Sequence, residues 1–195
     1  VKGMISPTVD GVVNGFEKIN YEALTLNSRM DNTNDRFLPT KGSIIDIGID
    51  AGLDEGLRFI GSSYKMSKFY SLQNILFKLK WVVKGMYYHK SFVPKSRYEW
   101  FGGTSSLRGY DERVLSATQY QVLSAEVGYV PFSKIQITSF IDVGSDRFNI
   151  LGENFLGYGI GLSQINEDSI LKIEYALSST SRDAGKLHVK LISRL

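Results

Sequence analysis

The residues of this chain that could do chemistry are carboxylates and arginines, because cysteine is absent and only two histidines occur. Without cysteine there is no thiol nucleophile, disulfide framework or Cys-ligated zinc site, and two histidines do not predict a metal centre. Asp46 with Asp50, or Asp142 with Glu174, has the composition of an acid–base pair. Carboxylates near lysines in alternating segments are more typical of internal salt bridges. The sequence therefore predicts no catalytic residue, no metal site and no cofactor.

A second pattern places carboxylates beside glycines at a spacing of two. Glu126 precedes a glycine by two residues, and Asp142 lies between Phe140 and Gly144 at the same spacing. Residues spaced by two in a strand share a face, so each carboxylate has open space beside it. Two inward carboxylates need a cation, and the planar fork of a loop arginine such as Arg108 can bind both. Spacing alone equally allows Arg108, Glu126 and Asp142 to be unconnected surface charges.

The elements that must position these residues are β-strands. Apolar and polar residues alternate in many segments, which predicts strands, and no segment follows the helical period. The segment from Lys90 to Thr118 interrupts the alternation, and so long a connection in an all-β chain is usually functional. The sequence predicts an antiparallel all-β fold with about nine strands, and residues 1–20 have room for a tenth. Strands are expected at 45–50, 75–87, 123–129, 135–144, 157–162, 169–178 and 186–195, with weaker candidates at 21–31 and 64–72.

Amphipathic strands must bury their apolar face, either inside a soluble barrel or sandwich or against lipid around a membrane barrel. The polar face consists of small residues with isolated charges, which fits a barrel lumen better than a water-exposed surface. The 23 Lys+Arg nearly balance 20 Asp+Glu, so nucleic acid is not an expected partner. We therefore favour an antiparallel transmembrane β-barrel over the alternative, a soluble β-barrel that binds an apolar ligand.

The interrupted segment carries more specific residues. Residues 101–110 read FGGTSSLRGY, residues 140–144 read FIDVG, and residues 31–42 read DNTNDRFLPTKG. In this order they resemble motifs of the Omp85 superfamily, the BamA/TamA-type bacterial surface antigen barrels of the outer membrane. The resemblance implies that the loop enters the lumen and that its arginine docks on acidic residues of the next two strands. The implied lumen lock comprises Arg108, Gly109, Tyr110, Glu126, Phe140, Asp142 and Gly144.

The length of 195 residues is about half of what a sixteen-stranded barrel of this family needs. The resemblance then implies a short form without POTRA domains. Closed bacterial barrels have even strand numbers, which allows eight or ten strands, and we predict eight because we interpret residues 1–32 as partly an N-terminal extension. Residues 1–32 would be an N-terminal extension with a possible first strand, and residues 33–195 the barrel, with residues 90–118 as the lumen-inserted loop. The alternatives are ten strands, or the C-terminal half of a sixteen-stranded barrel.

These features predict a non-enzymatic protein of the bacterial outer membrane. Eight strands leave a lumen filled by side chains, so we expect a minimal barrel with a membrane-structural or lipid-perturbing role rather than a full insertase. The alternatives are the C-terminal barrel of an outer-membrane assembly or secretion factor, or the anchor of a fused passenger. The expected partners are outer-membrane lipids, a second copy in a homodimer, and the barrel assembly machinery through the C-terminal strand.

Overall fold

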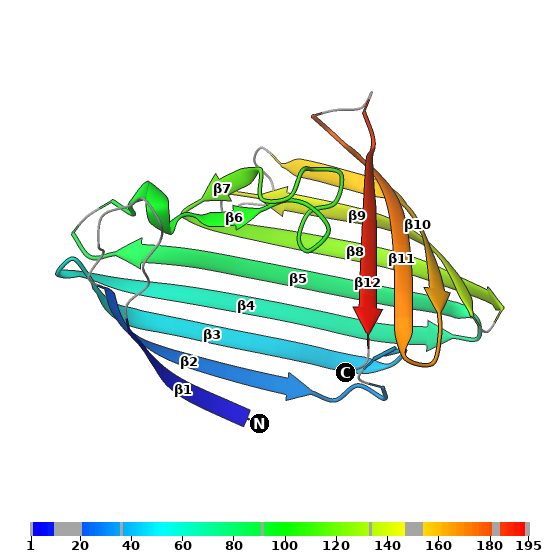
Figure 1. Cartoon of the computed structure of the whole chain (residues 1–195), viewed down its shortest axis with the longest axis horizontal. Helices are drawn as coiled ribbons and strands as arrows, with labels where there is room; N and C mark the ends of the chain where they lie inside the picture. Colours follow the sequence, from blue (N-terminus) through cyan, green and yellow to red (C-terminus); the bar gives the residue numbers. More distant parts are fainter. Residues whose placement is uncertain are drawn as a thin grey trace.

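The main element of the protein is one antiparallel sheet of ten strands (Figure 1). The computed structural model describes residues 2–9, 21–35, 37–90, 92–132, 134–146, 154–180 and 184–193. Strands adjacent in the chain are adjacent in the sheet, except that β5 pairs with β8 across the long connection. The strands of the sheet are β1 (Lys2–Val9), β2 (Tyr21–Asp31), β3 (Gly42–Asp54), β4 (Leu57–Leu72), β5 (Ile75–Tyr88), β8 (Gln119–Phe132), β9 (Ile135–Ser145), β10 (Phe155–Ile165), β11 (Ser169–Ser178) and β12 (Lys186–Ser193).

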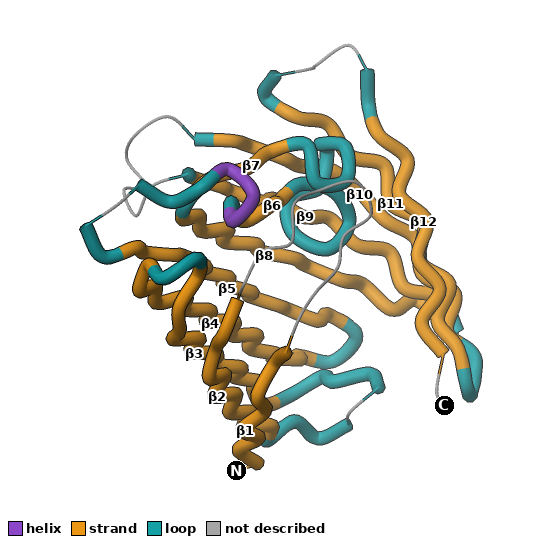
Figure 2. Tube along the Cα trace, turned by 60° about the vertical axis from the view of Figure 1, so that its left-hand side comes forward, coloured by secondary structure: helices purple, strands orange, loops and turns teal. Residues whose placement is uncertain are grey.

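The connection between β5 and β8 contains short elements of its own. A 3-10 helix, η1 (Lys95–Arg97), precedes a small hairpin of β6 (Glu99–Phe101) and β7 (Leu115–Ala117). The sheet is strongly curved, with β11 and β12 steeply inclined to β3, β4 and β5 (Figure 1), and the loop between β6 and β7 lies on its concave side (Figure 2). No helix in the described ranges is long and apolar enough to cross a membrane.

The two faces of the sheet differ in composition, as the alternation predicts. The concave face carries polar side chains that are buried beneath the loop or between strands, such as Ser124, Asp142 and Glu174. The convex face is apolar and exposed, which reverses the arrangement of a soluble protein and is typical of a lipid-facing wall. The soluble alternative needs the apolar face inside, and the structure places it outside. Exposed convex residues include Leu24, Ile47, Ile60, Leu79, Val127, Ile160 and Leu187.

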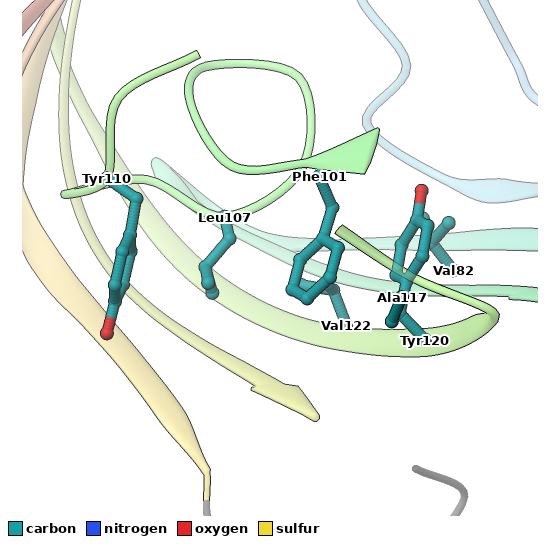
Figure 3. Close-up of a cluster of buried hydrophobic side chains, with 7 residues drawn as sticks. All are labelled: Val82, Phe101, Leu107, Tyr110, Ala117, Tyr120 and Val122. Carbon is teal, nitrogen blue, oxygen red and sulfur yellow. The ribbon is translucent and has the colours of Figure 1, made fainter. Parts of the chain in front are cut away.

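The hydrophobic core lies between the loop and the concave face of β5 and β8 (Figure 3). Phe101 of β6 stacks on Tyr120 of β8, with ring centroids 4.5 Å apart. Leu107 and Val122 are fully buried in the same cluster. Because the loop supplies half of this core, releasing the loop would expose apolar surface on both sides of the contact.

The prediction of eight strands is wrong, because the sheet has ten. The eight-strand count treated residues 1–32 as partly an N-terminal extension, and that interpretation is what failed. Within the described residues the sheet is open: β1 pairs only with β2, and β12 only with β11. The alternative of ten strands agrees in number. Residues 1–32 contribute two strands, β1 and β2, whereas residues 10–20 lie outside the described part of the chain. The division at residue 33 stays a prediction.

Candidate functional site

Arg108 belongs to the loop between β6 and β7 and lies at the centre of the site, facing three strands of the sheet. Only 7% of its surface is exposed. Its Nε and Nη2 donate to the two carboxylate oxygens of Asp142 at 2.8 and 2.7 Å, and its backbone N–H also donates to Asp142 at 3.0 Å. Its Nη1 donates to Glu126 at 2.9 Å and to Glu174 at 2.7 Å. One guanidinium therefore connects β8, β9 and β11.

The groups around Arg108 stabilise the charged form of its guanidinium. Its guanidinium carbon lies 3.5 Å from the centroid of the Phe140 ring, within the range of a cation–π contact. Burial lowers the pKa of Arg108, but the hydrogen bonds and charges of the carboxylates outweigh this and raise the pKa above its ordinary value. Lys172 adds a second cation, with Nζ 2.9 Å from Glu174 and 3.3 Å from Glu126. The cluster thus holds two cations and three carboxylates.

Glycines of β10 allow the loop to lie against the sheet. Gly157 pairs with Asp142 in register, and a Cβ on Gly157 would overlap the carbonyl oxygen of Arg108. Two residues along the same face, a Cβ on Gly159 would lie 2.8 Å from the ring of Phe140. Close approach of the loop backbone explains Gly157, and close approach of the Tyr175 carbonyl oxygen and the Phe140 ring explains Gly159.

The residues after Arg108 attach the loop to the C-terminal strands. Gly109 has a φ of +91°, a conformation that favours glycine, and its N–H donates to Nε2 of His188 on β12 at 3.3 Å. The Tyr110 hydroxyl lies 3.2 Å from Oγ of Ser179. On β9, a Cβ on Gly144 would lie 3.2 Å from the Leu107 side chain, so this glycine leaves room for the core of the loop.

A separate group fixes the start of the connection near η1. Arg97 Nε donates to Asp54 at the end of β3 at 2.9 Å, and the Tyr88 hydroxyl donates to the same carboxylate. Lys84 Nζ lies 3.1 Å from Glu99 of β6. The connection is therefore held near its start as well as at Arg108, further along the chain.

The structure places Glu126, Phe140 and Asp142 in contact with Arg108. Gly109 and Tyr110 instead reach His188 and Ser179, and Gly144 borders Leu107, so the joint role of the seven residues as a lumen lock stays a prediction. Sequence reasoning missed Glu174 as a partner of Arg108, although Glu174 was noted as a potential partner of Asp142 in an acid–base pair. The available signal was its spacing of two from Lys172, which places both side chains on the polar face of β11. The other carboxylate pair lies elsewhere, on β3: Asp46 contacts Arg29 at 3.3 Å, and Asp50 accepts from Thr25 at 2.6 Å.

A curved antiparallel sheet with an exposed apolar outer face, a polar inner face and a loop fixed inside defines the wall of a membrane-type β-barrel. The model of the Omp85 superfamily domain matches residues 17–183, and the chain belongs to this superfamily. The resemblance identified from the sequence motifs is thereby confirmed.

Two solved structures share the fold. BamA from Haemophilus ducreyi lacking POTRA domains 1–3 matches with a TM-score of 0.71 and 15% identity, over 87% of this chain and 41% of that one. CdiB from Acinetobacter baumannii matches with a TM-score of 0.59 and 20% identity, over 89% of this chain and 32% of that one. The chain thus spans less than half the length of either structure. A search of curated proteins gave no match.

Proposed function

We propose that this chain forms a lipid-facing wall in the bacterial outer membrane, and that Arg108 locks the connection 90–118 against the lumen side of that wall. The observation that carries the proposal is the division of the sheet into an exposed apolar face and a polar face that binds the loop. The role is non-enzymatic and membrane-structural. It depends on holding a curved sheet in lipid rather than on any reacting group.

The edge strands β1 and β12 need pairing partners if the sheet lies in a membrane. Unpaired N–H and C=O groups in hydrocarbon each cost several kcal/mol, so lipid-exposed edges are not stable. Edges of β1 and β12 therefore require a partner strand, and we propose that a second copy of the chain supplies it in a homodimer. The mass of the folded protein in detergent tests this: the expected value is twice 21.9 kDa, and a monomer would contradict the dimer.

A second candidate is the barrel portion of an outer-membrane assembly or secretion factor. The fold likeness to BamA and CdiB favours it, because that likeness extends over most of this chain. Proteoliposomes containing the folded chain test it directly. Faster insertion of an added outer-membrane protein, relative to empty liposomes, would support this candidate over a purely structural role.

Folding with and without detergent tests the membrane assignment. A heat-modifiable, faster-migrating species is expected only with detergent or lipid, because the apolar convex face needs an apolar environment. A monodisperse folded protein in plain buffer would contradict the proposal.

Replacing Ile160 by arginine tests which face meets lipid. Ile160 is 61% exposed on the convex face of β10, so Ile160→Arg is expected to cost about 2–4 kcal/mol near the bilayer midplane and to reduce folding into liposomes. The matched control is Ser63→Arg on the concave face, whose register partner Gly48 lies between Asp46 and Asp50 on β3. Those carboxylates can pair with the new cation, so the control should fold normally. Equal losses in both variants would argue against a lipid-facing convex surface.

A further inference from the structure

Five lysines line one cavity on the concave face, beside Arg108. Lys65 comes from β4, Lys78 and Lys80 from β5, Lys172 from β11 and Lys190 from β12. We call this cavity of ≈ 360 Å³ the lysine pocket. Its lysines come from two strands in the middle of the sheet and from the two strands at its C-terminal edge, so the curvature of the sheet is what brings them together (Figure 2).

The carboxylates near the lysine pocket do not balance its cations. The five lysines and Arg108 face Glu126 and Glu174, and Asp142 lies behind Arg108. These carboxylates are already engaged by Arg108 and Lys172. Six basic side chains against three carboxylates leave the pocket with an excess of basic groups over acidic ones.

Several of the lysines form no salt bridge with the described residues, although Lys78 stands opposite Glu126 in register. Within the described part of the chain, Lys80 donates to the carbonyl oxygen of Ser105, at 3.1 Å. Among the residues that the structure describes, Lys65, Lys78 and Lys190 form no salt bridge. The carboxylate opposite Lys65 in register, Asp46, is paired with Arg29. An internal network whose only purpose is stability would pair its charges, because like charges in a confined space repel one another.

We propose that the lysine pocket binds a multiply charged oxyanion of the phosphate class. Lysine ammonium groups act as point charges with three donors each and commonly bind phosphate. Ser67, Ser105 and Ser124 line the same cavity and can supply neutral hydroxyl donors, whereas both donors of Thr104 are bound to Glu112. This goes beyond the membrane-wall function, because it gives the lumen side of the wall a ligand.

An adjoining cavity has room for an apolar group attached to the phosphate. This second cavity, of ≈ 280 Å³, shares Phe69, Lys78, Glu126, Lys172 and Ile192 with the lysine pocket, and Glu126 is already bound by Arg108 and Lys172. Its other lining is largely apolar and includes Phe37, Leu38, Leu76 and Ile170. A phosphate bearing a short alkyl chain can therefore place its head among the lysines and its chain in the apolar cavity, whereas a free phosphate would use the lysine pocket alone.

The test is a calorimetric titration of the folded protein in a nonionic detergent. Inorganic phosphate, pyrophosphate and octyl phosphate are the probes. Saturable binding that weakens with added sodium chloride is expected, with pyrophosphate tighter than phosphate. Octyl phosphate at least tenfold tighter than phosphate would assign a lipid-like ligand, and equal affinity would assign free phosphate. The absence of saturable binding by folded protein at millimolar probe would overturn the proposal.

Single variants locate the binding site. Lys65→Gln and Lys190→Gln are each expected to weaken pyrophosphate binding roughly tenfold or more, because each removes a charge-assisted hydrogen bond. The matched control is Lys68→Gln, on β4 but on the opposite face from Lys65, and its affinity should not change. Equal affinity in wild type, Lys65→Gln and Lys190→Gln would overturn the proposal. Heat-modifiable mobility is recorded for every variant. A variant that does not fold into the membrane-type sheet is thereby distinguished from a folded variant that has lost binding.

Discussion

Arg108→Ala is expected to destabilise the folded protein by about 3–5 kcal/mol, because removing one partner of a buried ionic network leaves the others uncompensated. In this variant the fully buried carboxylate of Asp142 loses both hydrogen bonds from the guanidinium group. Within the described residues it also leaves Lys172 as the remaining salt-bridge partner of Glu126 and Glu174. The temperature at which the compact band disappears on semi-native gels should fall, as should the urea midpoint in detergent.

Two further substitutions separate the network from the loss of a positive charge. Arg29→Ala is the matched control, since the Arg29 side chain is 57% exposed and its contact with Asp46 is 3.3 Å long. An exposed pair of this kind contributes about 0–1 kcal/mol. Arg108→Lys should fall between the two, because an ammonium keeps the charge but cannot bind Asp142 with two parallel hydrogen bonds.

A double variant tests whether the cost arises from stranded carboxylates. Adding Asp142→Asn to Arg108→Ala removes the most deeply buried charge, so it should restore part of the lost stability. If Arg108→Ala lowers the free energy of unfolding no more than Arg29→Ala does, the contacts of Arg108 do not lock the loop.

The strands were predictable because alternation is local. Ile47 and Ile49 alternate with Asp46, Gly48 and Asp50, and this pattern is enough to indicate a half-buried strand and to say which residues share a face. It does not say whether the sheet closes. Closure depends on the curvature and on the partners of both edge strands. The even-number rule allowed eight or ten strands, and eight was wrong because residues 1–32, interpreted as partly an extension, supply β1 and β2.

The contacts of Arg108 were predictable only where the partner strands follow the loop directly along the chain. Glu126 and Asp142 lie on β8 and β9, which follow the loop directly, so order along the chain points to them. Glu174 follows Arg108 by 66 residues, and β10 lies between β9 and β11. Its contact requires glycines on β10 that let the loop approach the sheet. The lysine pocket was beyond sequence reasoning, because Lys65 and Lys190 belong to strands far apart in sheet order.

Gly157→Ala is expected to lift the loop from the sheet. The new Cβ would overlap the backbone carbonyl oxygen of Arg108, and a backbone atom, unlike the end of a side chain, cannot turn away. Overpacking of this kind costs about 1–3 kcal/mol, and here the strain falls on the residue that makes the network. We expect a lower dissociation temperature of the compact band and a newly exposed peptide bond after Arg108.

Limited trypsin digestion followed by mass spectrometry measures that exposure, because Arg108 is buried in the unmodified protein and cleavage after it requires the loop to move. Gly48→Ala is the matched control on the same face of β3: its Cβ would meet only side-chain oxygens, of Ser63 at 2.5 Å and Asn27 at 2.9 Å, which can rotate away. Rapid cleavage after Arg108 in Gly157→Ala but not in Gly48→Ala would establish that β10 needs a glycine there to seat the loop. Equal resistance in both would mean that the loop and β10 can separate slightly without breaking the contacts of Arg108.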